Sequence, residues 1–208
     1  MTLFSTDKLD RALGVYLALS AVVNAGYYSM VYGAGASDLL WFCNVAMILA
    51  AVGFFTKNSR LLSAVLAAAI SAQFFWIFAD LAYLAGKGPA GRLHWLGGRN
   101  SFFSFLFDLN YHFSVIPLAA LGVWKRGYHR RAYVTVVSIF LPLLVVTWYI
   151  TQAKDNINCV FYPCDVGFTD DHAEIYGLKY FIVRCVSFAV CIGVIDLALR
   201  KIFPRASS

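Results

Sequence analysis

Six runs of predominantly apolar residues, each about 20 residues long, constrain the fold of this chain more than any other feature. A run of this length is what an α-helix needs to cross the hydrocarbon core of a bilayer. The runs comprise residues 12–33, 38–56, 61–85, 102–124, 132–152 and 177–199. Each is continuously apolar, whereas the strands of a membrane barrel alternate over about 10 residues. The sequence therefore predicts an all-α polytopic membrane protein, a six-transmembrane-helix bundle that forms a single domain, 1–208.

The composition excludes other classes of protein. Of the 208 residues, 61% are hydrophobic and 13% are charged, whereas soluble domains are about 45–50% apolar and about 25% charged. A water-soluble globular protein, a disordered chain and a small disulfide-stapled protein are therefore excluded. A single bundle leaves no room for a separate soluble catalytic domain, so any chemistry must take place in the membrane or in short loops.

The distribution of lysine and arginine predicts which side each loop faces. Eleven of the 17 basic residues fall in the two terminal segments and in the connections 57–60 and 125–131. The loops on the other side, 86–101 and 153–176, hold four, namely Lys87, Arg92, Arg99 and Lys154. Because basic residues concentrate on the cytoplasmic side, we expect both termini inside and 153–176 as an outer loop. The short connections 57–60 and 125–131 also predict that the helices they join are antiparallel neighbours.

The net charge of +6 does not indicate a nucleic-acid partner, because the sequence has no basic soluble domain that could bind nucleic acid. The basic cluster 125–131 is typical of a stop signal that also meets anionic lipid headgroups. We expect membrane lipids as partners and no nucleic acid, and a homo-oligomer or a membrane-protein partner stays open. The expected location is a bacterial inner membrane or, in a eukaryote, the endoplasmic reticulum or the plasma membrane.

The cysteines allow two interpretations. Cys159 and Cys164 share the outer loop, where an oxidising environment would favour a disulfide between them, the alternative being two free thiols. Cys185 and Cys191 lie in an apolar run and are interpreted as packing residues. The spacing around His172 fits no common zinc pattern, and no haem, flavin or nucleotide motif is visible. We therefore expect no metal site and no cofactor.

Polar residues inside the apolar runs are the candidates for function, since ionisable groups are costly in a bilayer and mark a site or an internal pair. Seven of them, on five runs, fall between the predicted middle of the bundle and its outer surface. They are Asn24, Cys43, Asn44, Asp80, Asp108, His112 and Arg184. Asp196 is instead expected near the inner face, where it can pair with Arg200 at i+4.

A thiol and an imidazole from different helices can act as a nucleophile and its base. Cys43 and His112 are the candidates for these roles. Asp108 lies four residues before His112 on the same helical face, where its carboxylate would hold the imidazole in one tautomer. Such a site below the outer surface would suit an ester or acyl group presented by a lipid.

Other polar residues are expected to contact the substrate. Asn44 or Asn24 can donate hydrogen bonds to an oxyanion. Asp80 and Arg184 would lie beside them, and Arg184 can neutralise Asp80 or Asp108 or bind a lipid phosphate. The alternative is a buried polar network that only fixes the packing of the helices.

Three short stretches resemble a known family. They are Trp41-Phe42-Cys43-Asn44, Asn110-Tyr111-His112 and Asn156-Ile157-Asn158. Their order resembles that of the YwaF-like integral membrane family, which includes an acyltransferase acting on ether phospholipids, and bacterial membrane proteins with the same Trp-Phe-Cys-Asn and Asn-Ile-Asn stretches. The resemblance implies Cys43 as nucleophile, His112 as base, and Asn156 and Asn158 at the substrate. The family has a histidine where this chain has Trp41 and an acidic residue where it has Asn44.

Three functions therefore stay open. The first is lipid acyl transfer or hydrolysis by the pair Cys43 and His112. The second is a protein that binds or transports a small molecule, an ion or a lipid headgroup through Asp80, His112 and Arg184. The third is a membrane scaffold or accessory subunit in which the polar groups are structural.

Overall fold

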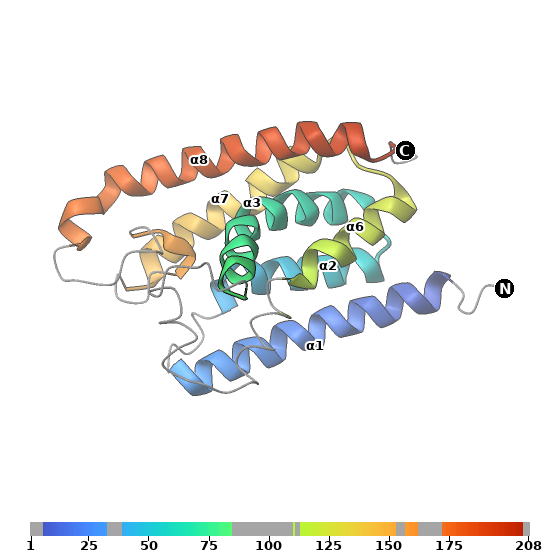
Figure 1. The fold of residues 1–208 in the computed structure, drawn as a ribbon, viewed down its shortest axis with the longest axis horizontal. Coiled ribbons are helices and arrows are strands. Elements are labelled where there is room, and N and C mark those ends of the chain that lie inside the picture. Colours follow the sequence, from blue (N-terminus) through green and yellow to red (C-terminus); the bar gives the residue numbers. More distant parts are fainter. Residues whose placement is uncertain are drawn as a thin grey trace.

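The structure is a computed structural model that describes residues 6–32, 39–84, 110, 113–152, 157–161 and 172–205. These residues form α-helices and one short 3₁₀ helix, which Figure 1 shows in chain order. They are α1 (Thr6–Tyr32), α2 (Phe42–Phe55), α3 (Ser59–Leu84), α6 (Val115–Arg126), α7 (Ala132–Ile150), η2 (Ile157–Cys159) and α8 (His172–Ile202). The prediction of an all-α fold is confirmed for the described residues, which contain no β-strand.

Helix α3 lies at the centre of the described bundle. Its residues 62–69 are all buried, and the helix packs against α2, α6, α7 and α8. A helix that is buried on every side needs neighbours all round it, which explains why this stretch is apolar or small throughout. Helix α1 packs along α2, and Figure 1 shows α1 and α8 on opposite sides of the group.

Two glycines allow the close approach of three helices around Leu62. A Cβ atom built on Gly53 of α2 would lie 2.9 Å from the Leu62 side chain, and one built on Gly122 of α6 would lie equally close. Leu62 itself is fully buried at the start of α3. Small residues at such positions let helix backbones approach each other, as they do in membrane bundles.

The structure confirms one predicted pair of neighbours and contradicts the other. Helices α2 and α3 pack together across a tight turn, in which the Asn58 side chain accepts a hydrogen bond from the Leu61 N–H (3.0 Å) as an N-cap. The prediction that the helices joined by 125–131 are neighbours is wrong, since α6 and α7 each pack on α3 and not along each other. Their connection crosses the start of α3, where the His129 N–H donates to Ser63 Oγ (3.0 Å).

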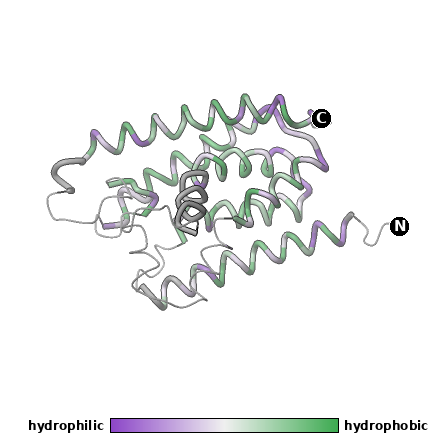
Figure 2. Tube along the Cα trace, viewed as in Figure 1, coloured by the Kyte–Doolittle hydropathy of each residue, from purple (hydrophilic) through white to green (hydrophobic). Residues whose placement is uncertain are grey.

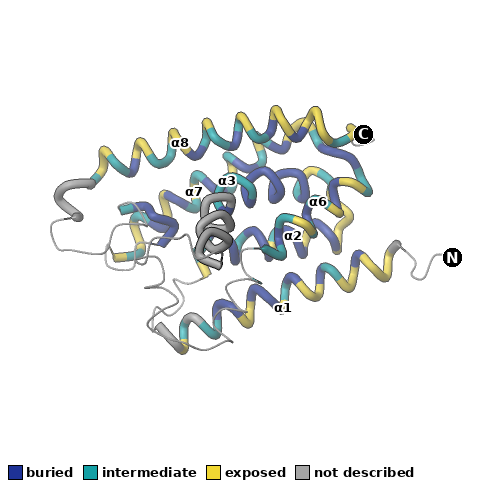
Figure 3. The backbone as a smooth tube through the Cα atoms, in the orientation of Figure 1, coloured by how far each residue is buried: buried dark blue, intermediate teal, exposed yellow. Residues whose placement is uncertain are grey.

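In the part of the chain that the structure describes, two helices are long and apolar enough to cross a membrane, namely Ala132–Ile150 and the part of α8 from Gly177 to Ile202. The second begins at Gly177, where a φ of +40° interrupts α8. Large apolar side chains on the outward side of this helix are more than half exposed: Val183, Val186, Val190, Val194 and Leu197. Figures 2 and 3 show that α8 is mainly hydrophobic along its length and exposed along its outward side. A face of this kind is suited to contact with lipid.

Candidate functional site

The described residues include Asn24, Cys43, Asn44, Asn158, Cys159 and Arg184 from the predicted site. Five further predicted residues lie outside the described residues, or have side chains that do: Asp80, Asp108, His112, Asn156 and Cys164. The pairing of Cys43 with His112, and the orienting role of Asp108, therefore stay predictions. Cys43 and Asn44 lie in the first turn of α2, and Asn158 is hydrogen-bonded to the same turn.

Asn158 fixes the backbone at the start of α2. Its Oδ1 accepts a hydrogen bond from the Phe42 N–H (2.8 Å), and its Nδ2 donates to the Leu40 carbonyl (2.7 Å) and to Thr147 Oγ1 (3.5 Å). The side chain is buried, with a left-handed φ of +57° that asparagine tolerates better than most residues. Asn158 therefore satisfies one of the unpaired N–H groups in the first turn of α2.

The Phe42 ring holds the same turn from the other side. It packs against Phe140 of α7 and Phe188 of α8, with ring centroids 4.8 Å apart in both pairs. Aromatic pairs at such distances add packing energy beyond the area that they bury. The first turn of α2 is thus held by both its backbone and its side chains.

Cys43 and Asn44 follow Phe42 in this turn, and both are buried. Cys43 is not disulfide-bonded. The first turn of a helix carries unpaired N–H groups and a partial positive charge, which together favour an anion. The fold therefore places the predicted nucleophile at a helix N-terminus that is held in position by Asn158.

A row of polar side chains lies on α1, and Asn24 is its member nearest to the start of α2. Tyr16, Ser20 and Asn24 are spaced by four residues and so share one face of the helix. Asn24 Nδ2 donates to the Met47 sulfur (3.9 Å), and Met47 lies one turn beyond Cys43 on the same face of α2. Ser20 and Asn24 are buried within the bundle.

Asn110 connects this row to the chain segment that contains His112. The Tyr16 hydroxyl donates to Asn110 Oδ1, and Asn110 Nδ2 donates to Ser20 Oγ (3.4 Å). Sequence reasoning noted Asn110 but missed Tyr16 and Ser20, although their spacing with Asn24 in an apolar run was a signal that could have found them.

Arg184 lies on the face of α8 that packs toward the same region. Phe181 and Phe188 share this face, where Phe188 contacts Phe42 and Phe181 stacks on Trp148 of α7 at 4.8 Å. The Nε atom of Arg184 is buried and makes no hydrogen bond to the described residues. Its predicted partners Asp80 and Asp108 have side chains outside those residues, so the predicted ion pairs are untested.

Cys159 is disulfide-bonded, whereas Cys43, Cys185 and Cys191 form no disulfide. Cys164 lies outside the described residues, so its pairing with Cys159 stays a prediction. Among the described side chains, no three metal-binding residues lie close enough to hold an ion.

Charged pairs lie at the opposite end of the bundle, where α1 begins and α8 ends. The predicted pair is confirmed, since Arg200 Nη2 lies 2.7 Å from Asp196 Oδ2. Sequence reasoning missed Asp10 of α1, a buried carboxylate paired with Lys125 Nζ (2.8 Å) and with Arg126. No periodic signal could have found this pair, because the partners lie more than 100 residues apart.

Comparisons of the chain with known protein families, with curated proteins and with solved structures find no match.

Proposed function

We propose that this chain is an integral membrane protein with six spans and both termini on the cytoplasmic side. The exposed apolar face of α8 and the length of α7 support its placement in a membrane. The start of α1 and the end of α8 lie at the same end of the bundle in Figure 1, as an even number of spans requires. That end carries the basic residues of 125–131 and the C-terminal segment, in keeping with the positive-inside rule.

The proposed activity is acyl transfer or hydrolysis on a membrane lipid. One observation carries it: Cys43, which forms no disulfide, is buried in the first turn of α2, a helix start that Asn158 holds in position. Asn110 supports the proposal, because it holds the chain two residues before His112 against α1, the helix that also carries Asn24. Asn44 lies next to Cys43 in the sequence, and Asn24 contacts Met47 one turn farther along α2, so both can supply amide groups.

The proposed reaction proceeds through a thioester. His112 accepts the Cys43 proton, and the sulfur attacks the ester carbonyl carbon of a lipid. Collapse of the tetrahedral intermediate breaks the bond to the alcohol oxygen, which takes the proton from His112 and leaves. Water or the hydroxyl of a second lipid then attacks the thioester, passing its proton through His112 back to the sulfur. The amide groups of Asn24 or Asn44 stabilise the oxyanion in both steps.

The test is the release or transfer of acyl chains by the purified full chain in phospholipid vesicles. Cys43→Ala and His112→Ala should each lower the rate by at least about 100-fold, whereas the control Cys191→Ala, which changes another free cysteine, should leave it unchanged. Thermal melting of each variant shows whether it is folded. An unchanged rate in folded Cys43→Ala would overturn the proposed reaction.

A second candidate is a scaffold or accessory subunit, and the contacts of Asn158 favour it. All of its polar side-chain atoms bind other groups of the protein, as expected of a residue with a structural role. For a scaffold, Cys43→Ala and His112→Ala would lower thermal stability or expression, and wild-type protein would release no acyl chains. Stabilisation by a ligand without acyl transfer, lost in His112→Ala, would instead favour a binding protein.

A further inference from the structure

A cavity of about 220 Å³ lies at the basic end of the bundle, far from Cys43 along the chain and on different elements. It is lined by Tyr128, Arg130, Arg200, Phe203 and Arg205, and we call it the arginine cavity. Its walls come from the connection between α6 and α7 and from the segment that ends α8. The Tyr128 N–H donates to the Pro204 carbonyl (2.7 Å), and this bond holds the two segments together.

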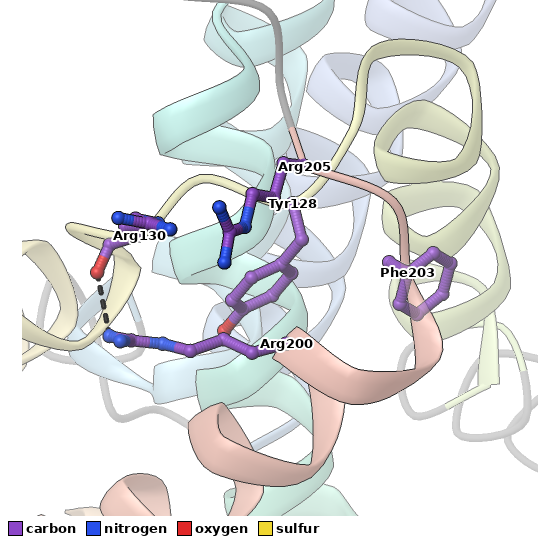
Figure 4. A pocket seen from close by; sticks show the side chains of 5 residues that line it. All are labelled: Tyr128, Arg130, Arg200, Phe203 and Arg205. Carbon is purple, nitrogen blue, oxygen red and sulfur yellow. Dashed lines mark hydrogen bonds between the residues drawn. The ribbon is translucent and has the colours of Figure 1, made fainter.

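The arginine cavity carries an excess of positive charge. In Figure 4 the guanidinium groups of Arg130, Arg200 and Arg205 gather on one side of the Tyr128 ring, and Phe203 lies on the other. Arg200 is held in place, since its Nη2 donates to the Arg130 carbonyl (2.6 Å) and pairs with Asp196. The side chains of Arg130 and Arg205 are exposed and form no ion pair with the described residues.

The carboxylate of Asp196 does not cancel this charge. It is buried behind the cavity, where it accepts hydrogen bonds from the Tyr128 hydroxyl (2.8 Å) and from Arg200. Burial, and then the hydrogen bond to Asp196, raise the pKa of Tyr128 well above its ordinary value of 10.0, so the phenol adds no charge. Three guanidinium groups against one carboxylate leave two positive charges, which a phosphate monoester dianion would balance.

The position of the cavity indicates where this phosphate comes from. Phe203 packs edge-to-face with Trp124 at 6.2 Å, and Trp124 is 69% exposed near the end of α6. An exposed tryptophan beside basic residues is typical of the interface between a membrane and water. The cavity is also smaller than the roughly 300–1,000 Å³ of sites for drug-sized ligands, so it is suited to a compact headgroup.

We propose that the arginine cavity binds the phosphate monoester of an anionic phospholipid in the cytoplasmic leaflet. Arginine is the side chain best matched to phosphate, because its planar fork can donate two parallel hydrogen bonds. The bound lipid would join the connection between α6 and α7 to the end of α8. This proposal relies on the placement in a membrane proposed above and is independent of any reaction at Cys43.

The test uses the detergent-solubilised full chain and dihexanoyl phosphatidic acid, with binding measured by calorimetry. We expect the double variant Arg130→Gln and Arg205→Gln to raise the Kd by about tenfold or more. The control Lys201→Gln removes a neighbouring charge outside the cavity, and we expect it to change the Kd by less than about twofold. Cys43→Ala should bind as the wild type does, which separates this site from the proposed reaction.

Two further ligands identify the source of the phosphate. Dihexanoyl phosphatidylglycerol, a diester with one negative charge, should bind at least about fivefold more weakly than phosphatidic acid. Inorganic phosphate should not displace phosphatidic acid at equal concentration. Displacement by inorganic phosphate would overturn the lipid as ligand. An unchanged Kd in the double variant, or an equal loss in Lys201→Gln, would overturn the site. If the double variant does not fold, the single variant Arg205→Gln, which changes an exposed side chain, replaces it in the binding measurement.

Discussion

At the scale of single residues, two aspartates one turn apart on α1 show how burial decides the value of an ion pair. Asp7 and Lys57 are paired at 2.7 Å, but both side chains are more than half exposed. Asp10 is 5% exposed and meets two cations, Lys125 and Arg126, that are themselves mostly buried. Water screens the first pair, whereas removal of Asp10 would leave two cations without their partner.

We therefore predict that Asp10→Asn lowers the free energy of unfolding by about 3 kcal/mol. The matched variant Asp7→Asn should have no measurable effect, because its pair is exposed. Reversible unfolding in mixed micelles measures both. Equal effects of the two substitutions would contradict the view that Asp10 holds α1 to α6.

The connection between α6 and α7 contains a residue that should respond to pH. Partial burial, and then the charges of Arg60 and Arg131, hold the pKa of His129 below its ordinary value of 6.5. Its Nδ1 accepts a hydrogen bond from the Arg131 N–H (3.1 Å), which also requires that nitrogen to be unprotonated. The unfolded chain therefore binds this proton at a higher pH than the folded chain does.

The sign of the effect follows from this lowered pKa. Above pH 6.5 His129 is neutral in both states and contributes no pH dependence, whereas stability should fall as the pH decreases below 6.5. We predict that His129→Asn, which keeps a side-chain acceptor, reduces this loss. Melting temperatures of both proteins between pH 7.5 and 5 measure it, and identical pH profiles would show that His129 does not contribute.

At the scale of helices, the contacts around Leu62 explain why α2, α3 and α6 can pack so closely. Gly53 and Gly122 both face this side chain, and neither leaves room for a Cβ atom without a shift. Pro117, inside a predicted span, lies in the first turn of α6 and not in its interior, where a missing N–H costs little. Local sequence thus determines where α6 begins and how near its neighbours come.

We predict that Gly53→Ala lowers the free energy of unfolding by about 1–2 kcal/mol, because the new methyl group would overlap the buried Leu62. Gly26→Ala on α1 is the control. A Cβ atom there meets nothing within 4 Å, so the change should be neutral or slightly stabilising. Destabilisation of both variants by the same amount would mean that close packing at Leu62 is not the cause.

At the scale of the whole molecule, some features follow from the sequence and others do not. The long apolar runs predicted a helical protein, and the i+4 spacing predicted the pair of Asp196 and Arg200. The length of a connection did not predict which helices touch, since 125–131 crosses α3 on its way to α7. The contacts of Asp10, of Asn158 and of the arginine cavity join distant segments, so no local pattern could reveal them.

The proposed topology predicts which residues a membrane-impermeant thiol reagent can reach. Single cysteines introduced at Lys57, between α2 and α3, or at Ser59, the first residue of α3, should be protected in sealed right-side-out membranes and react after permeabilisation. A cysteine introduced at Gln152, after α7, should react in both conditions. All three variants would use a background in which Cys43, Cys185 and Cys191 are replaced by alanine. Labelling of Lys57→Cys before permeabilisation would contradict cytoplasmic termini.

In the proposed reaction, Cys43 carries an acyl group during turnover. The most direct measurement is peptide mass spectrometry of the full chain, quenched at low pH during incubation with phospholipid vesicles. We predict an acyl thioester on the peptide that contains Cys43, which neutral hydroxylamine cleaves and which is absent from Cys43→Ala. Turnover with an unmodified Cys43 peptide, or an acyl group that persists in Cys43→Ala, would contradict it.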